Sequence, residues 1–138
     1  MALTELIYLS TMVGENEQAL KPIWDSAIKH NQVNGITGML LYYKGGFIQV
    51  LEGSRAKVME TFERIGKDTR HHHITTLTIT EVPSRQFGTW SMGFKHISAN
   101  EAAKFPKHGA VFNFKTQADA LRAEPGLALD MLRQFSRG

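Results

Sequence analysis

Two polar side chains, Tyr8 and Gln49, lie inside short apolar runs of the sequence and could form hydrogen bonds within a core. Gln49 interrupts the run from Phe47 to Leu51, and residues two apart on a strand share one face. A buried side-chain amide that lacks a partner costs about 1–3 kcal/mol. The sequence therefore predicts a polar partner over the face of Gln49, either another side chain or a bound ligand.

Tyr8 is the first candidate for that partner. We expect its strand to lie centrally in the sheet, beside the strand of Gln49, so that the phenol and the amide face each other. The two groups could simply satisfy each other, or they could border a ligand. Asn31 lies where the first helix is expected to end, and its amide could cap the turn or point into the same cavity.

A second polar set follows the second expected helix. Arg64 and Asp68 are four residues apart on one helix face, and His71 lies just beyond the helix. The pair could form an exposed ion pair, or it could form a polar rim for a hydroxylated or phosphorylated ligand tail. The run of three histidines does not predict a metal site, because neighbouring side chains on an extended segment point to opposite faces.

These side chains must be positioned by alternating strands and helices. The helical spacing predicts helices at residues 16–30, with Asn16 as a cap, and at residues 56–68. Pro22 falls inside the first pattern, so this helix could instead begin near Lys21, with Pro22 in its first turn. Strands are expected at residues 5–9, 36–43, 47–52, 74–82 and 88–96. The order βαββαββ predicts an α+β, ferredoxin-like sheet with both helices on one face.

The hairpin strands are apolar on both faces, so the face opposite the helices must be covered as well. The apolar spacing after residue 99 predicts two helices, at residues 117–122 and 127–135. We therefore expect residues 1–97 to form the ligand-binding domain and residues 98–138 to form a C-terminal helical cap on the other face.

Composition narrows the functional classes. The chain has 138 residues, no cysteine and a net charge of +3, with its 16 Lys and Arg scattered along the sequence. This argues against disulfides, cysteine chemistry and a concentrated nucleic-acid-binding face. We expect a cytoplasmic protein that does not bind a membrane, because no apolar run approaches about 20 residues and no signal peptide is evident. A small ferredoxin-like enzyme of the acylphosphatase type and an RNA-binding module are the alternatives.

Several motifs, taken in order, resemble the BLUF family, the sensors of blue light using flavin. The resemblance spans about residues 5 to 97 in a single register. It is carried by Ile7-Tyr8-Leu9-Ser10, Asn31, and the stretches at residues 35–42, 47–53, 65–71 and 85–93.

This resemblance implies a photoreceptor, not an enzyme, that binds FAD non-covalently, with FMN or riboflavin as other candidates. Tyr8 would donate an electron and a proton through Gln49, and Trp90 and Met92, on a last strand expected beside Gln49, would relay the signal. The output would be light-dependent binding of a signalling protein, with a homo-oligomer also expected. The implied flavin-binding residues are Tyr8, Ile23, Asn31, Gln49, Arg64, Ile65, Asp68 and His71.

Overall fold

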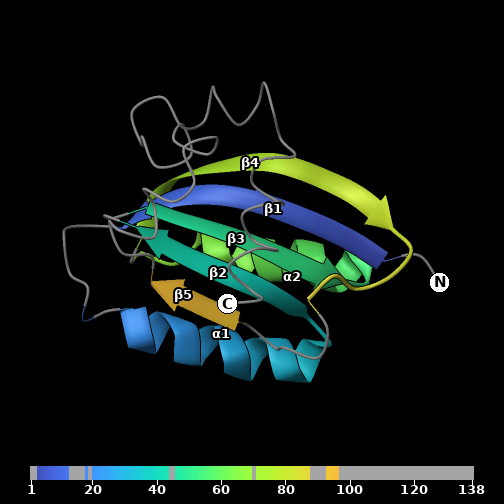
Figure 1. Ribbon diagram of the computed structural model, residues 1–138, viewed down its shortest axis with the longest axis horizontal. Coiled ribbons are helices and arrows are strands. Elements are labelled where there is room, and N and C mark those ends of the chain that lie inside the picture. The colour runs from blue at the N-terminus through green and yellow to red at the C-terminus, as the bar shows by residue number, and fades with distance from the viewer. Residues whose placement is uncertain are drawn as a thin grey trace.

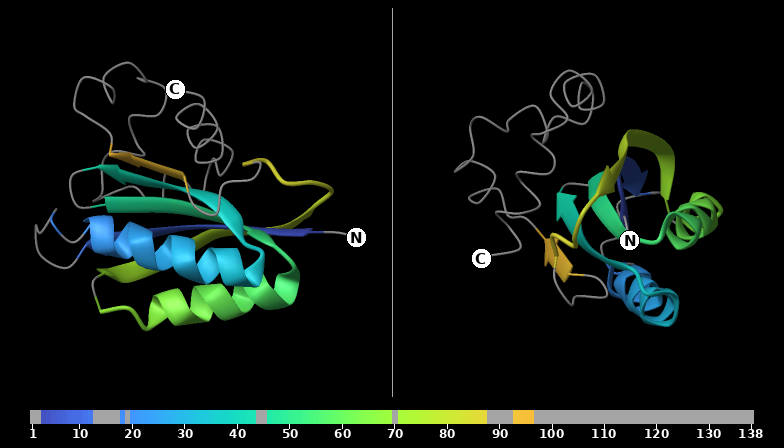
Figure 2. Two further views of the ribbon diagram at one scale, coloured as in Figure 1. Left: turned by 90° about the horizontal axis from the view of Figure 1, so that it is seen from below. Right: turned by 90° about the vertical axis from the view of Figure 1, so that its right-hand side faces the viewer.

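The computed structural model describes residues 3–12, 18, 20–43, 46–69, 71–87 and 93–96, which form a five-stranded sheet with two helices (Figure 1). Both helices lie on the same side of the sheet (Figure 2). This arrangement confirms the predicted α+β, ferredoxin-like fold. In chain order the elements are β1 (Leu3–Met12), α1 (Leu20–Asn34), β2 (Thr37–Tyr43), β3 (Gly46–Gly53), α2 (Arg55–Gly66), β4 (His71–Val82) and β5 (Gly93–His96).

The strand order is β4-β1-β3-β2-β5, and only the pair β2–β5 is parallel. β1 therefore lies directly beside β3, as the sequence predicts, with Tyr8 opposite Gln49 in the register. The expected position of the last strand is wrong for the part described. β5 pairs with β2, so β2 separates it from Gln49. Both edges of β3 are already taken by β1 and β2, so β5 cannot pair with β3 directly. Trp90 and Met92 lie outside the described residues.

α1 continues to Asn34, four residues beyond its expected end, because its C-terminal cap lies at Gly35. Gly35 has φ 67°, the left-handed conformation that favours glycine after a helix. The N–H of Ile36 then donates to the carbonyl of Asn31 at 3.0 Å. Asn31 consequently lies in the last turns of the helix instead of after its end. The expected cap Asn16 lies outside the described residues.

α2 begins after Ser54, whose hydroxyl accepts a hydrogen bond from the N–H of Lys57 at 3.4 Å. The helix ends at Gly66, two residues before its expected end. The N–H of Asp68 donates to the carbonyl of Ile65 at 3.0 Å, which holds the next residues as a continuing turn. Asp68 is thereby kept close to the last turn of α2.

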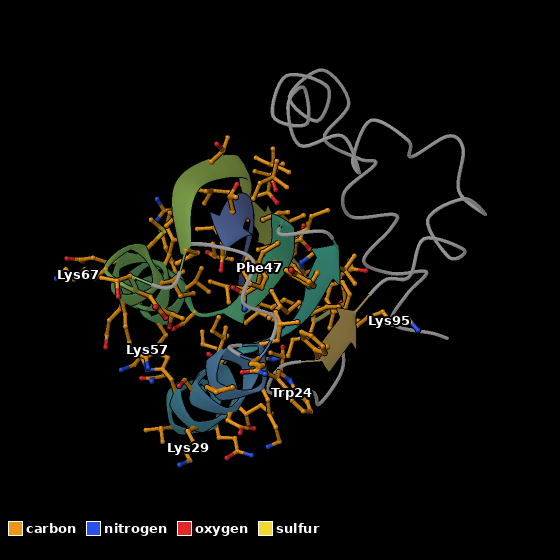
Figure 3. The ribbon with its side chains drawn as sticks, turned by 90° about the vertical axis from the view of Figure 1, so that its left-hand side faces the viewer. Trp24, Lys29, Phe47, Lys57, Lys67 and Lys95 are labelled. Atoms are coloured by element: carbon orange, nitrogen blue, oxygen red, sulfur yellow. The ribbon has the colours of Figure 1, made fainter. Side chains whose placement is uncertain are left out.

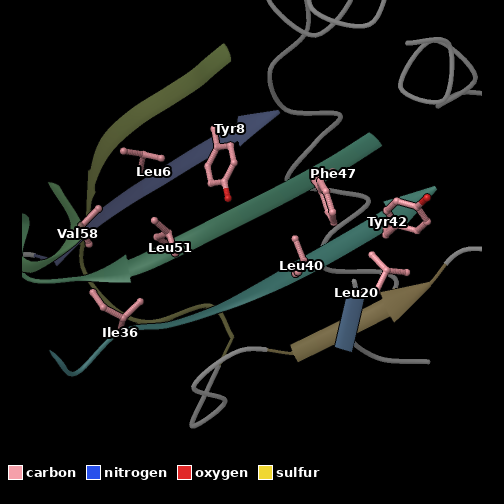
Figure 4. Packing of buried hydrophobic residues seen from close by; sticks show 9 residues of the cluster. All are labelled: Leu6, Tyr8, Leu20, Ile36, Leu40, Tyr42, Phe47, Leu51 and Val58. Atoms are coloured by element: carbon pink, nitrogen blue, oxygen red, sulfur yellow. The ribbon is translucent and has the colours of Figure 1, made fainter. Parts of the chain in front are cut away.

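The core lies between the helices and the sheet. Leu6 and Tyr8 from β1, Phe47 and Leu51 from β3, and Leu40 from β2 all face this side (Figure 4). All eight residues of β3 are buried, which agrees with the expectation that both faces of the hairpin are covered. The predicted C-terminal cap lies outside the described residues, so the proposed domain division stays a prediction.

Candidate functional site

A pocket opens between α1, α2 and the helix-covered face of the sheet. It contains about 560 Å³ of space free of protein atoms, counting the part that is open to solvent. The structure brings all eight residues of the predicted site to this pocket, although they come from five different elements and the turn after α2. They are Tyr8, Ile23, Asn31, Gln49, Arg64, Ile65, Asp68 and His71.

Tyr8 and Gln49 form the inner wall of the pocket. The Tyr8 hydroxyl donates a hydrogen bond to Oε1 of Gln49, and the two side chains are 3% and 4% exposed. The hydroxyl of Tyr8 points from β1 toward β3 (Figure 4). Direct pairing of the two residues across the strands explains the contact, because opposite side chains on one face lie about 4.5–5.5 Å apart at Cβ.

The surroundings of Tyr8 keep its phenol neutral. Burial raises the pKa of Tyr8 well above its usual range, and the negative charge of Asp68 raises it further. The ring of Phe62 on α2 lies 5.4 Å from the ring of Tyr8, measured between centroids. A neutral, desolvated phenol that is hydrogen-bonded to an amide can release a proton only along that hydrogen bond.

Asn31 places a second amide in the pocket. Its side chain is 2% exposed and lies on the pocket side of α1, on the same helix face as Ile23. The bond from the Ile36 N–H to the Asn31 carbonyl fixes the backbone at this point. Asn31 and Gln49 together offer amide donors and acceptors from opposite walls of the pocket.

His71 ties three elements together at the pocket. Its Nδ1 lies 2.8 Å from the hydroxyl of Ser10 on β1, and its Nε2 lies 2.7 Å from the backbone carbonyl of Ile65 on α2. A carbonyl can only accept, so Nε2 must carry a proton; in the neutral ring, Ser10 then donates to Nδ1. The ring lies 6.4 Å from the rings of both Tyr8 and Phe47. His71 is therefore part of the inner wall as well as of the rim.

The two helices that flank the pocket are joined by His30 and Thr61. Nε2 of His30 on α1 lies 3.0 Å from the hydroxyl of Thr61 on α2. Burial lowers the pKa of His30, Arg64 and Lys57 lower it further, and Glu60 acts in the opposite direction. Thr61 is buried and lines the pocket, so this contact holds α1 and α2 together beside the site.

Six pocket-lining residues were not predicted as site residues. Leu40 and Phe47 could have been found from strand alternation, and Thr61 from its position one turn before Ile65. Ser26 and Ala27 lie on the α1 turn between Ile23 and Asn31, where helical spacing also indicates them. The six are Ser10, Ser26, Ala27, Leu40, Phe47 and Thr61.

The mouth of the pocket is polar. Arg64, Ile65 and Asp68 border both the pocket and a second hollow on its outer side, to which Lys67 also contributes. Lys57, Lys67 and Lys29 point away from the sheet on the outer surfaces of α2 and α1 (Figure 3). The lining therefore changes from aliphatic, aromatic and amide groups inside to charged groups at the mouth, which fits a flat heteroaromatic ring with a polar, phosphorylated tail.

The family model described as sensors of blue-light using FAD matches residues 3–93. The antirepressor BluF of Escherichia coli (strain K12), described as regulated by blue light and temperature, is 33% identical over 102 residues. This match covers 72% of the chain and 25% of that protein. A photoactivated adenylate cyclase subunit beta of Euglena gracilis is 33% identical over 92 residues, which are 65% of the chain and 11% of that protein.

Solved structures agree with these relatives. The dark-state structure of BlrB, a BLUF protein, superposes with a TM-score of 0.78 at 25% identity and covers 99% of this chain and 96% of that one. The ground-state structure of BlsA superposes with a TM-score of 0.70 at 34% identity, covering 78% of this chain and 73% of that one.

The pocket, the fold and these matches define a flavin-based sensor of blue light, and the chain belongs to the BLUF family. FAD is the cofactor of this domain. BLUF domains are sensors and not themselves enzymes, so the family match favours the photoreceptor over the acylphosphatase and RNA-binding alternatives. The chain spans about a tenth to a quarter of the length of the curated relatives it matches. Among the residues described, no helix is long and apolar enough to cross a membrane.

Proposed function

We propose that this chain is a cytoplasmic, non-enzymatic blue-light receptor that binds FAD in the pocket between α1 and α2 and signals by light-dependent contact with another protein or a second copy of itself. The single observation that carries the photochemical part is the buried hydrogen bond from Tyr8 to Gln49 at the inner wall of that pocket. The output is proposed from the relatives, whose names describe a photoactivated adenylate cyclase and an antirepressor regulated by blue light.

Each part of the pocket fits one part of FAD. Ile23 and Ile65 would border the two faces of the ring, and Asn31 would hydrogen-bond its polar edge. Arg64, Asp68 and His71 would lie along the ribityl chain and the phosphates, where Arg64 supplies a positive charge. Gln49 would face the ring on the side of Tyr8. The donors and acceptors that line the pocket therefore match the chemistry of the cofactor.

The light reaction uses Tyr8 as donor and Gln49 as relay. When excited by blue light, the bound flavin supplies a strong one-electron oxidant. Tyr8 would give up an electron to that oxidant, and its hydroxyl proton would pass along the hydrogen bond to Gln49, which would relay it to the flavin. When the electron and the proton return, the Gln49 amide stays rotated or tautomerised, so a different group of the amide faces Tyr8 and the ring. Nothing is consumed, and the changed hydrogen bonds shift the absorption to the red until the amide relaxes.

A comparison of two tyrosine variants tests this proposal. The wild-type protein should purify yellow, release FAD on heat denaturation and show a reversible red shift under blue light. Tyr8→Phe keeps the ring and removes the donating hydroxyl, so this variant should stay yellow and lose the red shift. Tyr42→Phe is the matched control, because Tyr42 is equally buried and does not line the pocket. A normal red shift in Tyr8→Phe would show that the donor assignment is wrong.

A further inference from the structure

β3 carries a buried carboxylate, Glu52, on the sheet face opposite the pocket. It binds a segment of the chain that does not line the pocket. Glu52 is 0% exposed, and its Oε2 accepts a hydrogen bond from the N–H of Gln86 at 2.5 Å. Its Oε1 accepts from the N–H of Phe87 at 3.2 Å and from the hydroxyl of Thr37 at 2.9 Å. Three donors from two separate segments therefore converge on one carboxylate.

Arg85 reinforces the same arrangement from the surface. Its guanidinium donates to the hydroxyl of Thr37 at 2.8 Å and to the backbone carbonyls of Glu52 at 3.1 Å and Gly35 at 2.8 Å. The Thr37 hydroxyl thus accepts from Arg85 and donates to Glu52, so it links the cation to the buried anion. We call the set Thr37, Glu52, Arg85, Gln86 and Phe87 the Glu52 clasp.

The clasp is connected to both amides of the pocket. Glu52 follows Gln49 by three positions on β3, roughly 10 Å along the strand, and its side chain lies on the opposite sheet face. Gly35, whose carbonyl Arg85 holds, belongs to the turn that fixes the backbone of Asn31. A displacement of β3 or of the end of α1 would therefore be transmitted to residues 85–87.

Stability alone does not account for a carboxylate at this position. Removing a charge from water costs several kcal/mol, and well-placed buried ion pairs often add little net stability over apolar side chains. What a carboxylate does provide is directional, charge-assisted bonding to two consecutive backbone N–H groups. That bonding sets the position of residues 86 and 87 relative to β3, and Phe87 is itself buried beside it.

We propose that Glu52 is a positioning residue that couples the state of the flavin pocket to residues 85–87 on the far face of the sheet. The proposal rests on the light reaction proposed above. In it, the change at Gln49 displaces β3, the carboxylate moves with its strand, and the hydrogen bonds to Gln86 and Phe87 lengthen or shorten. The clasp thereby carries the change from the helix-covered face of β3 to the face on which an output partner could act.

The experiment is amide hydrogen exchange, resolved at Gln86 and Phe87, on the FAD-loaded full chain in the dark and under blue light. In the wild-type protein, light should change the exchange rates of both amides. Glu52→Gln keeps the size of the side chain and removes the charge, so the Gln86 N–H loses a charge-assisted acceptor. Its dark exchange should accelerate by about tenfold or more, and the light-minus-dark difference at both amides should disappear.

The flavin red shift separates this effect from a loss of photochemistry or of the fold. Glu52→Gln should keep the red shift of the wild-type protein, because Glu52 does not line the pocket. Glu81→Gln, which removes an exposed carboxylate from β4, is the matched control and should leave both the exchange difference and the red shift unchanged. If Glu52→Gln does not fold, Arg85→Gln removes three hydrogen bonds from an exposed position and should reduce the light-minus-dark difference in the same direction.

The outcomes are distinguishable. A wild-type protein with an intact red shift and no light-minus-dark difference at Gln86 and Phe87 would overturn the role of the clasp and leave the light reaction standing. The same holds if Glu52→Gln, or Arg85→Gln in its place, retains the full difference. A wild-type protein with no red shift would overturn the proposed light reaction, and with it the coupling that depends on it.

Discussion

The hydrogen bond between Tyr8 and Gln49 can be measured directly as a coupling free energy. Tyr8→Phe removes the donor and leaves Oε1 of Gln49 buried at a position that is 4% exposed. Loss of one partner from a buried pair costs about 1–3 kcal/mol in the free energy of unfolding. Gln49→Met keeps an unbranched side chain of similar length and removes the acceptor, so it leaves the Tyr8 hydroxyl without this bond. Each single variant should therefore be destabilised.

The double variant decides whether the two residues act as a pair. When both partners are apolar, neither buried polar group is left unsatisfied. The double variant should therefore lose less free energy of unfolding than the sum of the two single losses, by at least about 1 kcal/mol. Urea unfolding of the FAD-loaded proteins in the dark measures these free energies. Bound FAD contributes to each one through its own affinity, so the separately measured Kd of every variant removes that contribution.

A second cycle provides the control. Tyr42→Phe combined with Gln49→Met tests a tyrosine that pairs with Phe47 and not with Gln49. This pair should be additive to within about 0.5 kcal/mol. If the Tyr8–Gln49 cycle is additive to the same degree, the hydrogen bond does not couple the two residues, and the reasoning from their register and burial is refuted.

Two further predictions concern the helices and the mouth of the pocket. The pKa of His30 is lower in the folded protein than in the unfolded chain, so the unfolded chain binds the proton more readily. The free energy of unfolding should therefore rise as the pH increases through about 6.5, and it should fall as the pH drops through the folded pKa. Urea midpoints measured across that window should rise with pH, and His30→Gln should reduce this slope. An unchanged slope in the variant would show that His30 is not its source. Arg64→Ala should raise the Kd for FMN by up to about fivefold, the effect of one exposed charge, and leave the Kd for riboflavin unchanged. Arg55→Ala, at an exposed position outside the pocket lining, is the control for this comparison, and an equal loss for both ligands would show that Arg64 does not contact the phosphate.

The fold and the grouping of the site residues could be predicted because both follow from strict periodicities. Strand alternation places Gln49 on the face of Phe47 and Leu51, and helical spacing places Ile23 and Asn31 on one side of α1. The predicted helix ends were less accurate. α1 extends to Asn34 because the left-handed residue is Gly35, and the polar residues before it remain helical. The sequence pattern alone does not show which glycine or asparagine will adopt that conformation.

Strand pairing and the clasp depend on contacts between segments far apart in the sequence. The periodicity of residues 88–96 predicts a strand but not its neighbour. β3 has no free edge, and β5 pairs with β2. The sequence pattern does not indicate a functional role for Glu52, because a charged residue at the end of an apolar strand is usually exposed to solvent. The carboxylate is instead buried, and residues 86 and 87, which return to that end of β3 from far along the chain, supply two of its donors.

β3 carries a polar residue on each face of an otherwise apolar, fully buried strand. The amide of Gln49 faces the pocket, where its neighbour Tyr8 is held neutral by burial. The carboxylate of Glu52 faces the other side, where it accepts from two backbone N–H groups of a connecting segment and from the hydroxyl of Thr37. An amide can change its hydrogen bonds by rotating in place, whereas a carboxylate bonded to two backbone N–H groups can respond only by moving with its strand or by releasing them. The strand thus places a group that can change its hydrogen bonds on one face and a group that responds to displacement of the strand on the other.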